Sequence, residues 1–215
     1  MSLQTLGAVR PPTYPARPIN GGRLELAPPK PGQWCYEPKY NGWRALVHAS
    51  TGLMFNRYAQ PLSISAEFGS ALKCLRKVVL SAGGSAVEWF DCEALDRRHA
   101  LGRGTLLVFD FITTPVMATV EPWRKRKQIL AQALPEHDYS QVPLPEALYG
   151  VPAHDPAEID PQELYRQLRQ LNARWGCQFY EGLVAKRITD AYPRQLSSPH
   201  QEFVGWVKHR WAGSR

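Results

Sequence analysis

Short apolar runs separated by Gly, Asn and Ser begin at Trp34 and recur to the end of the chain. They are rich in aromatic and β-branched residues, and most are too short for helices. The runs read WCYEPKY, RALVHA, GLMFNRY, AVEWFDCEAL, LLVFDFI, CQFYEGLVAKRI and EFVGWVKHRW. Runs of this kind, bounded by turn residues, are typical of β-strands that pair antiparallel. The pattern therefore predicts a largely antiparallel β-sheet structure.

Two longer segments between these runs repeat their apolar residues every three or four positions, as helices do. The first covers Ser65 to Leu80 and the second Pro122 to Leu134. On the first, the apolar positions are Phe68, Leu72, Leu75 and Val79. With strands on both sides of them in the sequence, the two segments indicate an α+β fold.

A third helix carries its own start and stop signals in DPQELYRQLRQLNARWG. Asp160 is placed to cap the first turn, Pro161 suits the first helical position, and Glu163 stands at the capping-box position. Gly176 ends the pattern. The face that we expect to be buried consists of Leu164, Leu168, Leu171 and Trp175.

Two segments, near the start and in the second half of the chain, show neither strand nor helix patterns over most of their length. Residues 1–33 contain seven prolines, too many for regular structure, and we expect a proline-rich arm leading into one domain over residues 34–215. Pro135 to Ala157 is rich in Pro, His, Asp and Ala and is expected to form a long loop containing one strand.

Composition narrows the class of protein. Of the 215 residues, 44% are hydrophobic and 21% charged, which suits a folded domain. The net charge of +7 favours a polyanionic partner such as nucleic acid or nucleotide phosphate. Four separated cysteines without a CxxC indicate neither zinc nor disulfides. There is no membrane-length apolar run and no signal-peptide pattern, so we expect a cytoplasmic, monomeric protein without membrane contact.

The first candidate for chemistry is Lys39 in YEPKYNGWRALV. The Asn-Gly pair after it favours a hairpin turn, which would let Lys39 and Arg44 face one cleft from adjacent strands. The alternative is an ordinary hairpin with both cations in solvent. Asp91 and Glu93, two apart in DCEAL, share one face of a strand, and a solvent-exposed face is the alternative for them too.

Six motifs in fixed order then resemble the covalent nucleotidyltransferases: ATP-dependent DNA ligases, RNA ligases and mRNA capping enzymes. They read KYNGWR, FNRY, DCEAL, VFDFI, EGLVAKR and WVKHR, and they cover Glu37 to Arg210. The family pattern is KxDGxR, a strand arginine, DGE, an FD pair, EGxxxK and KxK. The helical PWRKRKQIL after FDFI also looks like that of DNA ligases. The resemblance implies an adenylation domain of two antiparallel sheets with flanking helices around an ATP cleft, ATP-grasp-like.

The resemblance implies that Lys39 attacks the α-phosphate of ATP and holds AMP as a phosphoramidate. A free lysine is protonated at neutral pH, so we expect neighbouring cations to favour the neutral amine and to stabilise charge on the phosphate. The expected cations are Arg44, Lys186, Lys208 and Arg210. Arg57 would contact the 5′-phosphate or the AMP.

Two carboxylates and an aromatic residue complete the implied site. Glu93 and Glu181 would hold Mg²⁺, with Mn²⁺ as a substitute, or its water shell; a ribose contact is the competing role for Glu93. Phe109 would stack on adenine, with a plain core aromatic as the alternative. The backbone around Glu37 would read the amino edge of the base.

The sequence departs from the family pattern at three motif positions. Asn41 replaces Asp, Cys92 replaces Gly, and Arg210 replaces the second lysine of KxK. Only five residues follow the last motif, so we expect no OB-fold domain in this chain, and a partner protein supplying an OB-fold or DNA clamp is one explanation.

The function expected is ATP-dependent sealing of nicked duplex DNA in repair, replication or recombination. The alternatives are an RNA ligase acting on RNA, a capping-type guanylyltransferase, and a catalytically weak nucleic-acid-binding module that needs a partner OB domain. Contacts mainly to phosphate would not separate DNA from RNA.

Overall fold

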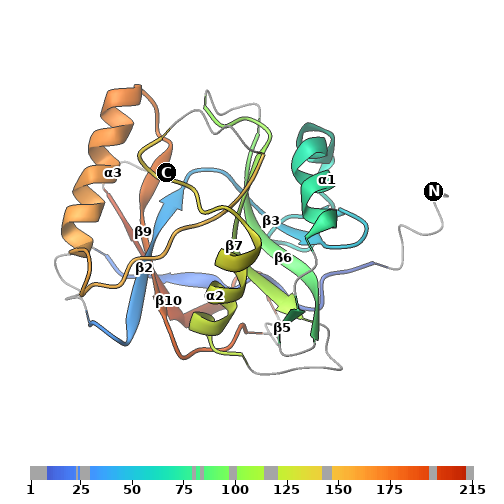
Figure 1. Ribbon diagram of the computed structural model, residues 1–215, viewed down its shortest axis with the longest axis horizontal. Helices are drawn as coiled ribbons and strands as arrows, with labels where there is room; N and C mark the ends of the chain where they lie inside the picture. The colour runs from blue at the N-terminus through green and yellow to red at the C-terminus, as the bar shows by residue number, and fades with distance from the viewer. Residues whose placement is uncertain are drawn as a thin grey trace.

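A computed structural model describes residues 9–22, 24, 30–78, 81–82, 85–96, 101–113, 121–141, 147–193 and 198–211. Two β-sheets face each other, and helices cover their outer sides (Figure 1). Over the described ranges, no helix is both long enough and apolar enough to span a lipid bilayer.

The larger sheet has six strands. Its main path runs β4-β3-β6-β7-β8, and the short β5 pairs with β6. The strands are β3 Trp43–His48, β4 Met54–Phe55, β5 Ser81–Ala82, β6 Ser85–Leu95, β7 Thr105–Thr113 and β8 Leu148–Gly150. One face of this sheet packs against helices and the other faces the second sheet. Side chains alternate along each strand, so neighbouring residues point to opposite faces.

The smaller sheet has the order β1-β10-β9-β2. Its strands are β1 Arg17–Asn20, β2 Trp34–Tyr40, β9 Tyr180–Arg187 and β10 Glu202–Arg210. All the strands of the larger sheet lie between β2 and β9 in the sequence. The smaller sheet is therefore assembled from the two ends of the chain.

Both sheets contain one parallel pair, which the prediction of purely antiparallel sheets missed. β7 pairs with β8 and β1 with β10 in parallel, while the other strand pairs are antiparallel. The β8 pairing arises because the chain first passes through a helix and returns from the other end of the sheet.

The expectation that residues 1–33 lack regular structure is wrong at Arg17–Asn20, which form β1. β1 is an edge strand, so only one of its sides pairs, and Pro18 is tolerated although it has no N–H to donate. β1 belongs to the same sheet as β2, β9 and β10.

The helices lie close to their predicted positions. Residues Ser63–Phe68 form a 3₁₀ helix, η3, that leads into α1 Gly69–Lys77, while Val79 and Leu80 fall outside the described residues. α2 covers Trp123–Ala133. The predicted strand within the loop Pro135 to Ala157 is β8, and residues 142–146 of that loop are not described.

The third helix, α3 Pro161–Trp175, begins and ends where the sequence predicts. The side chain of Asp160 accepts a hydrogen bond from the Gln162 N–H at 3.0 Å, and Gly176 takes the left-handed conformation. Glu163 does not complete the capping box, because its carboxylate bonds to Arg166 and Gln167 on the next turn.

Among the described residues, three large hydrophobic clusters hold these layers together, and a small fourth one joins the start of α2 to β2 through Trp123 and Cys35. One joins the outer face of the larger sheet to α1 and α2, and a second packs α3 against β2 and β9. The third lies between the sheets, around Leu46, Trp89 and Trp206. Because this inner layer is filled over only part of its extent, it leaves a pocket between the two sheets.

Candidate active site

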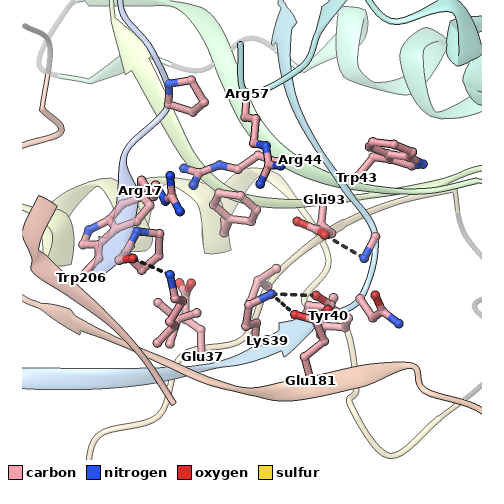
Figure 2. A pocket seen from close by; sticks show the side chains of 18 of the residues that line it. Arg17, Glu37, Lys39, Tyr40, Trp43, Arg44, Arg57, Glu93, Glu181 and Trp206 are labelled. Carbon is pink, nitrogen blue, oxygen red and sulfur yellow. Dashed lines mark hydrogen bonds and ion pairs between the residues drawn. The ribbon is translucent and has the colours of Figure 1, made fainter. Parts of the chain in front are cut away.

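The pocket between the sheets has a volume of about 530 Å³. All ten site residues expected from the sequence line it, from both walls: Glu37, Lys39, Arg44, Arg57, Glu93, Phe109, Glu181, Lys186, Lys208 and Arg210. Figure 2 shows Lys39 and Glu181 on one side and Arg44, Arg57 and Glu93 across from them. Their chemical roles stay predictions.

Lys39 reaches the pocket because β2 alternates its side chains between two environments. Tyr36 and Tyr40 pack in the α3 cluster, whereas Glu37 and Lys39 line the pocket. The Lys39 ammonium donates to Glu181 Oε2, and it also lies 3.5 Å from the carbonyl oxygen of Tyr40 (Figure 2). Lys39 is therefore held at the pocket surface by a carboxylate of the neighbouring strand.

Glu181 owes its position to the glycine that follows it. On β9, Leu183 and Ala185 pack in the α3 cluster, and strict alternation would place Glu181 with them. Gly182 has φ of 145°, a conformation closed to residues with a side chain, and β2 shows a register shift opposite it. The irregularity leaves the Glu181 carboxylate in the pocket.

β10 adds two cations to this wall, Lys208 and Arg210, because side chains two residues apart on a strand point to the same face. Arg210 Nη2 lies 2.9 Å from Glu181 Oε2, the same oxygen that accepts from Lys39. Lys208 donates to the carbonyl of Pro18 on β1 at 3.1 Å. Burial lowers the pKa of Lys208, and the neighbouring Arg17 and Arg210 lower it further.

Deeper in the pocket, Glu37 is a buried carboxylate shared by two lysines. Lys127 on α2 donates to one oxygen at 2.8 Å, and the Lys186 ammonium lies 2.6 Å from the other. Burial lowers the pKa of Lys186, although Glu37 and Asp110 act to raise it. The close ion pair with Glu37 orients the Lys186 side chain.

The opposite wall carries a fixed arginine. The Arg44 guanidinium binds the buried Asp91 through two hydrogen bonds, of 2.9 and 2.5 Å. The Tyr192 hydroxyl donates to the same carboxylate at 2.5 Å. Two bonds to one carboxylate fix the plane of the guanidinium. Asp91 therefore positions Arg44, a contribution that the sequence prediction did not assign to it.

An aromatic pair lies between the two walls. Phe109 on β7 lines the pocket, with the Arg44 guanidinium 5.0 Å and the Lys186 ammonium 4.9 Å from its ring centre. Trp206 on β10 meets it edge to face at 6.4 Å. Trp206 was missed by the prediction, although the alternation that places Lys208 and Arg210 in the cleft also places Trp206 there.

Glu93 faces Lys39 from the larger sheet. Its Oε1 accepts the Gly42 N–H at 2.8 Å (Figure 2). Burial raises the pKa of Glu93, against the opposing effects of Lys39, the Gly42 N–H and Arg44, while Glu181 contributes to the rise. Cys92 points to the other face of β6, into the helix-side cluster, so it adds no group to the pocket.

The expected Asn-Gly hairpin does not form. β2 pairs with β9 and β3 with β6, so Asn41 and Gly42 carry the chain from one sheet to the other. The Asn41 N–H donates to the Phe179 carbonyl and its side-chain amide to the Gln178 carbonyl. These long-range bonds override the local preference for a hairpin, and Lys39 and Arg44 face each other across two sheets.

Glu93 and Glu181 suit a divalent cation that retains most of its water. They approach from opposite walls, and within the described ranges no cluster of three or more His, Cys, Asp or Glu is placed to bind a metal ion. Mg²⁺ is commonly bound through one or two carboxylates together with substrate phosphates. The residues present fit such a site, completed by a nucleotide, rather than a cage made by the protein alone.

Arg17 is a further cation of the pocket that the sequence prediction missed. It lies on β1, and its place beside the cleft depends on the pairing of β1 with β10, a contact between opposite ends of the sequence. A basic residue in a proline-rich segment carries no local signal of such a contact.

Solved structures of DNA ligases share this fold. The ligase domain of LigD from M. tuberculosis aligns with 92% of this chain and 59% of its own at 19% identity, with a TM-score of 0.58. A mycobacterial DNA ligase D complexed with ATP and MES also gives 0.58 at 19% identity, over 92% of this chain and 60% of its own.

A more distant match is the Chlorella virus DNA ligase-adenylate, with a TM-score of 0.51 and 14% identity over 92% of this chain and 69% of that one. No protein-family model and no curated protein matches the sequence. The chain thus spans about three fifths of the length of the two mycobacterial structures. Its fold is the one shared by these ligase domains.

Proposed function

From this shared fold, we propose that the protein is a covalent nucleotidyltransferase of the ligase type that uses ATP to seal nicked duplex DNA. The observation that carries the proposal is the setting of Lys39: an accessible amine in a basic pocket, in contact with one carboxylate and facing another. A surface lysine has no need of such an arrangement.

In the first step, the Lys39 amine attacks the α-phosphorus of ATP. The N–P bond forms as the bond to the bridging oxygen breaks, and pyrophosphate leaves with that electron pair. Glu181, which already accepts a hydrogen bond from this ammonium, is placed to take its proton. Arg44, Lys208 and Arg210 stabilise the charge that develops on the phosphate oxygens.

Mg²⁺ bound between Glu93 and Glu181 would supply further neutralisation of phosphate charge. Phe109 packs partly against the core, but its ring also lines the pocket, with the Arg44 and Lys186 cations about 5 Å from its centre, and there it would stack on the adenine base. A base stacked there would have Glu37 and β2 at its edge, which agrees with the expected reading of adenine by that backbone.

The later steps transfer AMP. A 5′-phosphate oxygen attacks the lysyl-AMP phosphorus, which releases Lys39 and leaves a 5′-adenylated strand; the 3′-hydroxyl then attacks the 5′-phosphate, and AMP departs. Arg57 lies on the wall opposite Lys39, where a strand phosphate would arrive (Figure 2). A partner carrying an OB-fold or a DNA clamp would hold the duplex against this face.

The test is covalent labelling. The chain is incubated with Mg²⁺ and ATP or GTP labelled at the α-phosphate, after any AMP already bound has been removed with pyrophosphate, and is run on a denaturing gel. We expect label from ATP on the wild type and none on Lys39→Ala, because no other amine occupies that position. Lys73→Ala, which removes an exposed lysine of α1, is the matched control and keeps its label.

Absence of label with either nucleotide, or equal label on Lys39→Ala, would contradict the proposal. Preferential label from GTP would point to a capping-type enzyme instead. Nicked DNA and nicked RNA carrying a preformed 5′-adenylate then compare the two substrates. We expect sealing of the DNA nick, which needs neither ATP nor the first step.

A further inference from the structure

Among the described residues, three large hydrophobic side chains are exposed: Trp43, Tyr58 and Val204, at 42%, 39% and 62% of their surface. Both aromatic residues line the pocket between the sheets, whereas Val204 does not. An exposed aromatic side chain at the edge of a binding pocket is a common mark of a contact surface.

Trp43 is held in one orientation at this edge. Its indole N–H donates to Asp96 Oδ2 at 2.9 Å, so one end of the ring system is tied to the end of β6. Trp43 lies beyond Glu93 on the side of the pocket away from Trp206 (Figure 2). An aromatic ring fixed at one end presents a flat surface at little cost in conformational entropy.

Tyr58 presents a second ring at the same pocket. The guanidinium of Arg57 lies 4.9 Å from the centre of the Tyr58 ring, and His200 meets that ring edge to face at 6.1 Å. The turn that carries both residues is tied by the Asn56 side chain, which accepts the Tyr58 N–H at 2.8 Å. Each exposed ring is thus adjacent in sequence to an arginine of the pocket, Trp43 to Arg44 and Tyr58 to Arg57.

We propose that Trp43 and Tyr58 form a stacking rim for unpaired bases of the nucleic-acid strand whose phosphate enters the pocket. This deepens the proposed function and rests on it for the identity of the pocket. A nicked duplex is then bound best where the bases beside its 5′-phosphate are frayed or extend as a single strand.

The choice of a single-stranded occupant follows from geometry and charge. In a continuous duplex the faces of the bases are covered by their neighbours, so a protein ring can stack only on a base that is unpaired or terminal. The pocket beside the rim carries a clear excess of cations: Arg17, Lys39, Arg44, Arg57, Lys186, Lys208 and Arg210 against Glu37, Glu93 and Glu181. Basic grooves combined with aromatic rings are the usual means of holding single strands.

The experiment measures binding without ATP, by fluorescence anisotropy at one fixed salt concentration. Three 5′-phosphorylated hairpins are compared: one blunt, one with a four-nucleotide single-stranded extension, and one with an extension of the same length made of abasic units. The abasic extension keeps the phosphates but has no base faces. We expect the base-containing extension to bind about tenfold more tightly than the abasic one, the range that stacking on one or two bases provides.

Substitutions identify the rings. Trp43→Ala and Tyr58→Ala should each remove several-fold of that preference, and the double variant should remove all of it. Trp43→Phe and Tyr58→Phe keep a ring and should retain most of it. Val204→Ala, the matched exposed hydrophobic residue outside the pocket, should bind all three hairpins as the wild type does. Thermal denaturation of each variant confirms that it is folded.

Equal affinity for the base-containing and abasic extensions in the wild type would overturn the proposal. So would an alanine variant that weakens all three hairpins alike, or one that instead weakens binding of ATP. A DNA and an RNA version of each extension are run in parallel, because stacking serves both. The labelling of Lys39 is a separate measurement. If labelling fails, the stacking preference can still be observed; if the stacking preference is absent, the labelling result still tests the proposed function.

Discussion

Asn41 replaces the aspartate of the family pattern, and its contacts give the substitution a physical reason. Its side-chain amide donates to the Gln178 carbonyl at 2.8 Å, a bond that a carboxylate cannot make because it has no donor. The bond ties the crossing between the two sheets to the segment before β9, next to Lys39. Asn41 is therefore a positioning residue in this chain.

Asn41→Asp should lower the free energy of unfolding by about 1 kcal/mol, because a carboxylate would face a carbonyl oxygen there. It should also fail to speed the covalent labelling of Lys39. Urea denaturation and the initial rate of labelling measure the two effects, and Asn41→Ala, which also lacks the donor, should lose stability to a similar extent. Faster labelling with unchanged stability would show that the aspartate of the family pattern is the better residue here too.

His137 makes stability depend on pH. Burial lowers its pKa from 6.5 to about 4, with the Gln141 carbonyl and Asp138 acting in the opposite direction, and its ring lies 2.7 Å from the Tyr40 hydroxyl. Since the unfolded chain binds this proton below pH 6.5 and the folded chain does not, stability is complete above 6.5 and declines as the pH falls toward 4.

The loss attributable to His137 between pH 6.5 and about pH 5 is on the order of 2 kcal/mol. His137→Gln keeps a polar side chain but has no proton to bind, so its unfolding free energy should change less over this range. Denaturant titrations at several pH values compare the two proteins. Parallel curves for wild type and variant would assign the pH dependence to other groups.

The residue scale was the most predictable, because period two along strands places alternate side chains in one environment. Six short motifs were enough to select ten residues that the fold brings to one pocket. The same rule applied to β10 would have added Trp206. The structural roles of Asp91 and Lys127 could not be assigned from sequence. Asp91 binds Arg44 and Lys127 binds Glu37, and each of these contacts joins residues of two separate elements.

At the scale of elements, β9 shows how one glycine shapes the site. A side chain at Gly182 would place its Cβ 1.9 Å from the His209 carbonyl oxygen on β10, and its φ of 145° is open essentially to glycine alone. The His209 carbonyl cannot move away from that Cβ without breaking the pairing of β9 with β10. A glycine is therefore required at position 182 for β9 to take the conformation that places Glu181 in the pocket.

Gly182→Ala should therefore give little folded protein, or a protein destabilised by several kcal/mol. Gly69→Ala is the matched control, because nothing lies within 4 Å of a Cβ built there and Gly69 begins the regular helix α1. That variant should be as stable as the wild type or up to about 1 kcal/mol more stable. Thermal unfolding distinguishes the two, and equal stability for both variants would refute the role of Gly182.

Element type and position were largely predictable, whereas strand pairing was not. Capping and periodicity located α3 to the residue. The Asn-Gly pair predicted a hairpin by a local rule, yet β2 found its partner in β9, some 140 residues later. No local pattern encodes which sheet a strand joins, because that choice is made by packing across the whole fold.

At the scale of the whole molecule, the positive charge matters most at the pocket, where cationic side chains outnumber carboxylates. When a protein binds nucleic acid through phosphates, the logarithm of the binding constant falls linearly with the logarithm of the salt concentration, with a slope set by the number of phosphates neutralised. Arg57 lines the pocket, whereas Arg169 is an exposed arginine of α3 that does not.

Arg57→Ala should weaken binding of a nicked duplex and make the salt slope shallower by about 1. Arg169→Ala removes the same charge from the molecule and should leave the slope unchanged. Binding isotherms at four or more salt concentrations measure both. Equal slopes for the two variants would mean that total charge, rather than the pocket, governs binding.

The origin of the smaller sheet from both ends of the chain has a consequence for the order in which a ribosome makes the site. Lys39 emerges early on β2, but Glu181, Lys186, Lys208 and Arg210 emerge only with β9 and β10. The complete pocket therefore forms only after β10 has been synthesised, and its closure is a long-range folding event. A chain that stops before β9 would carry Lys39 without the groups that surround it, so we expect it to take no label from ATP.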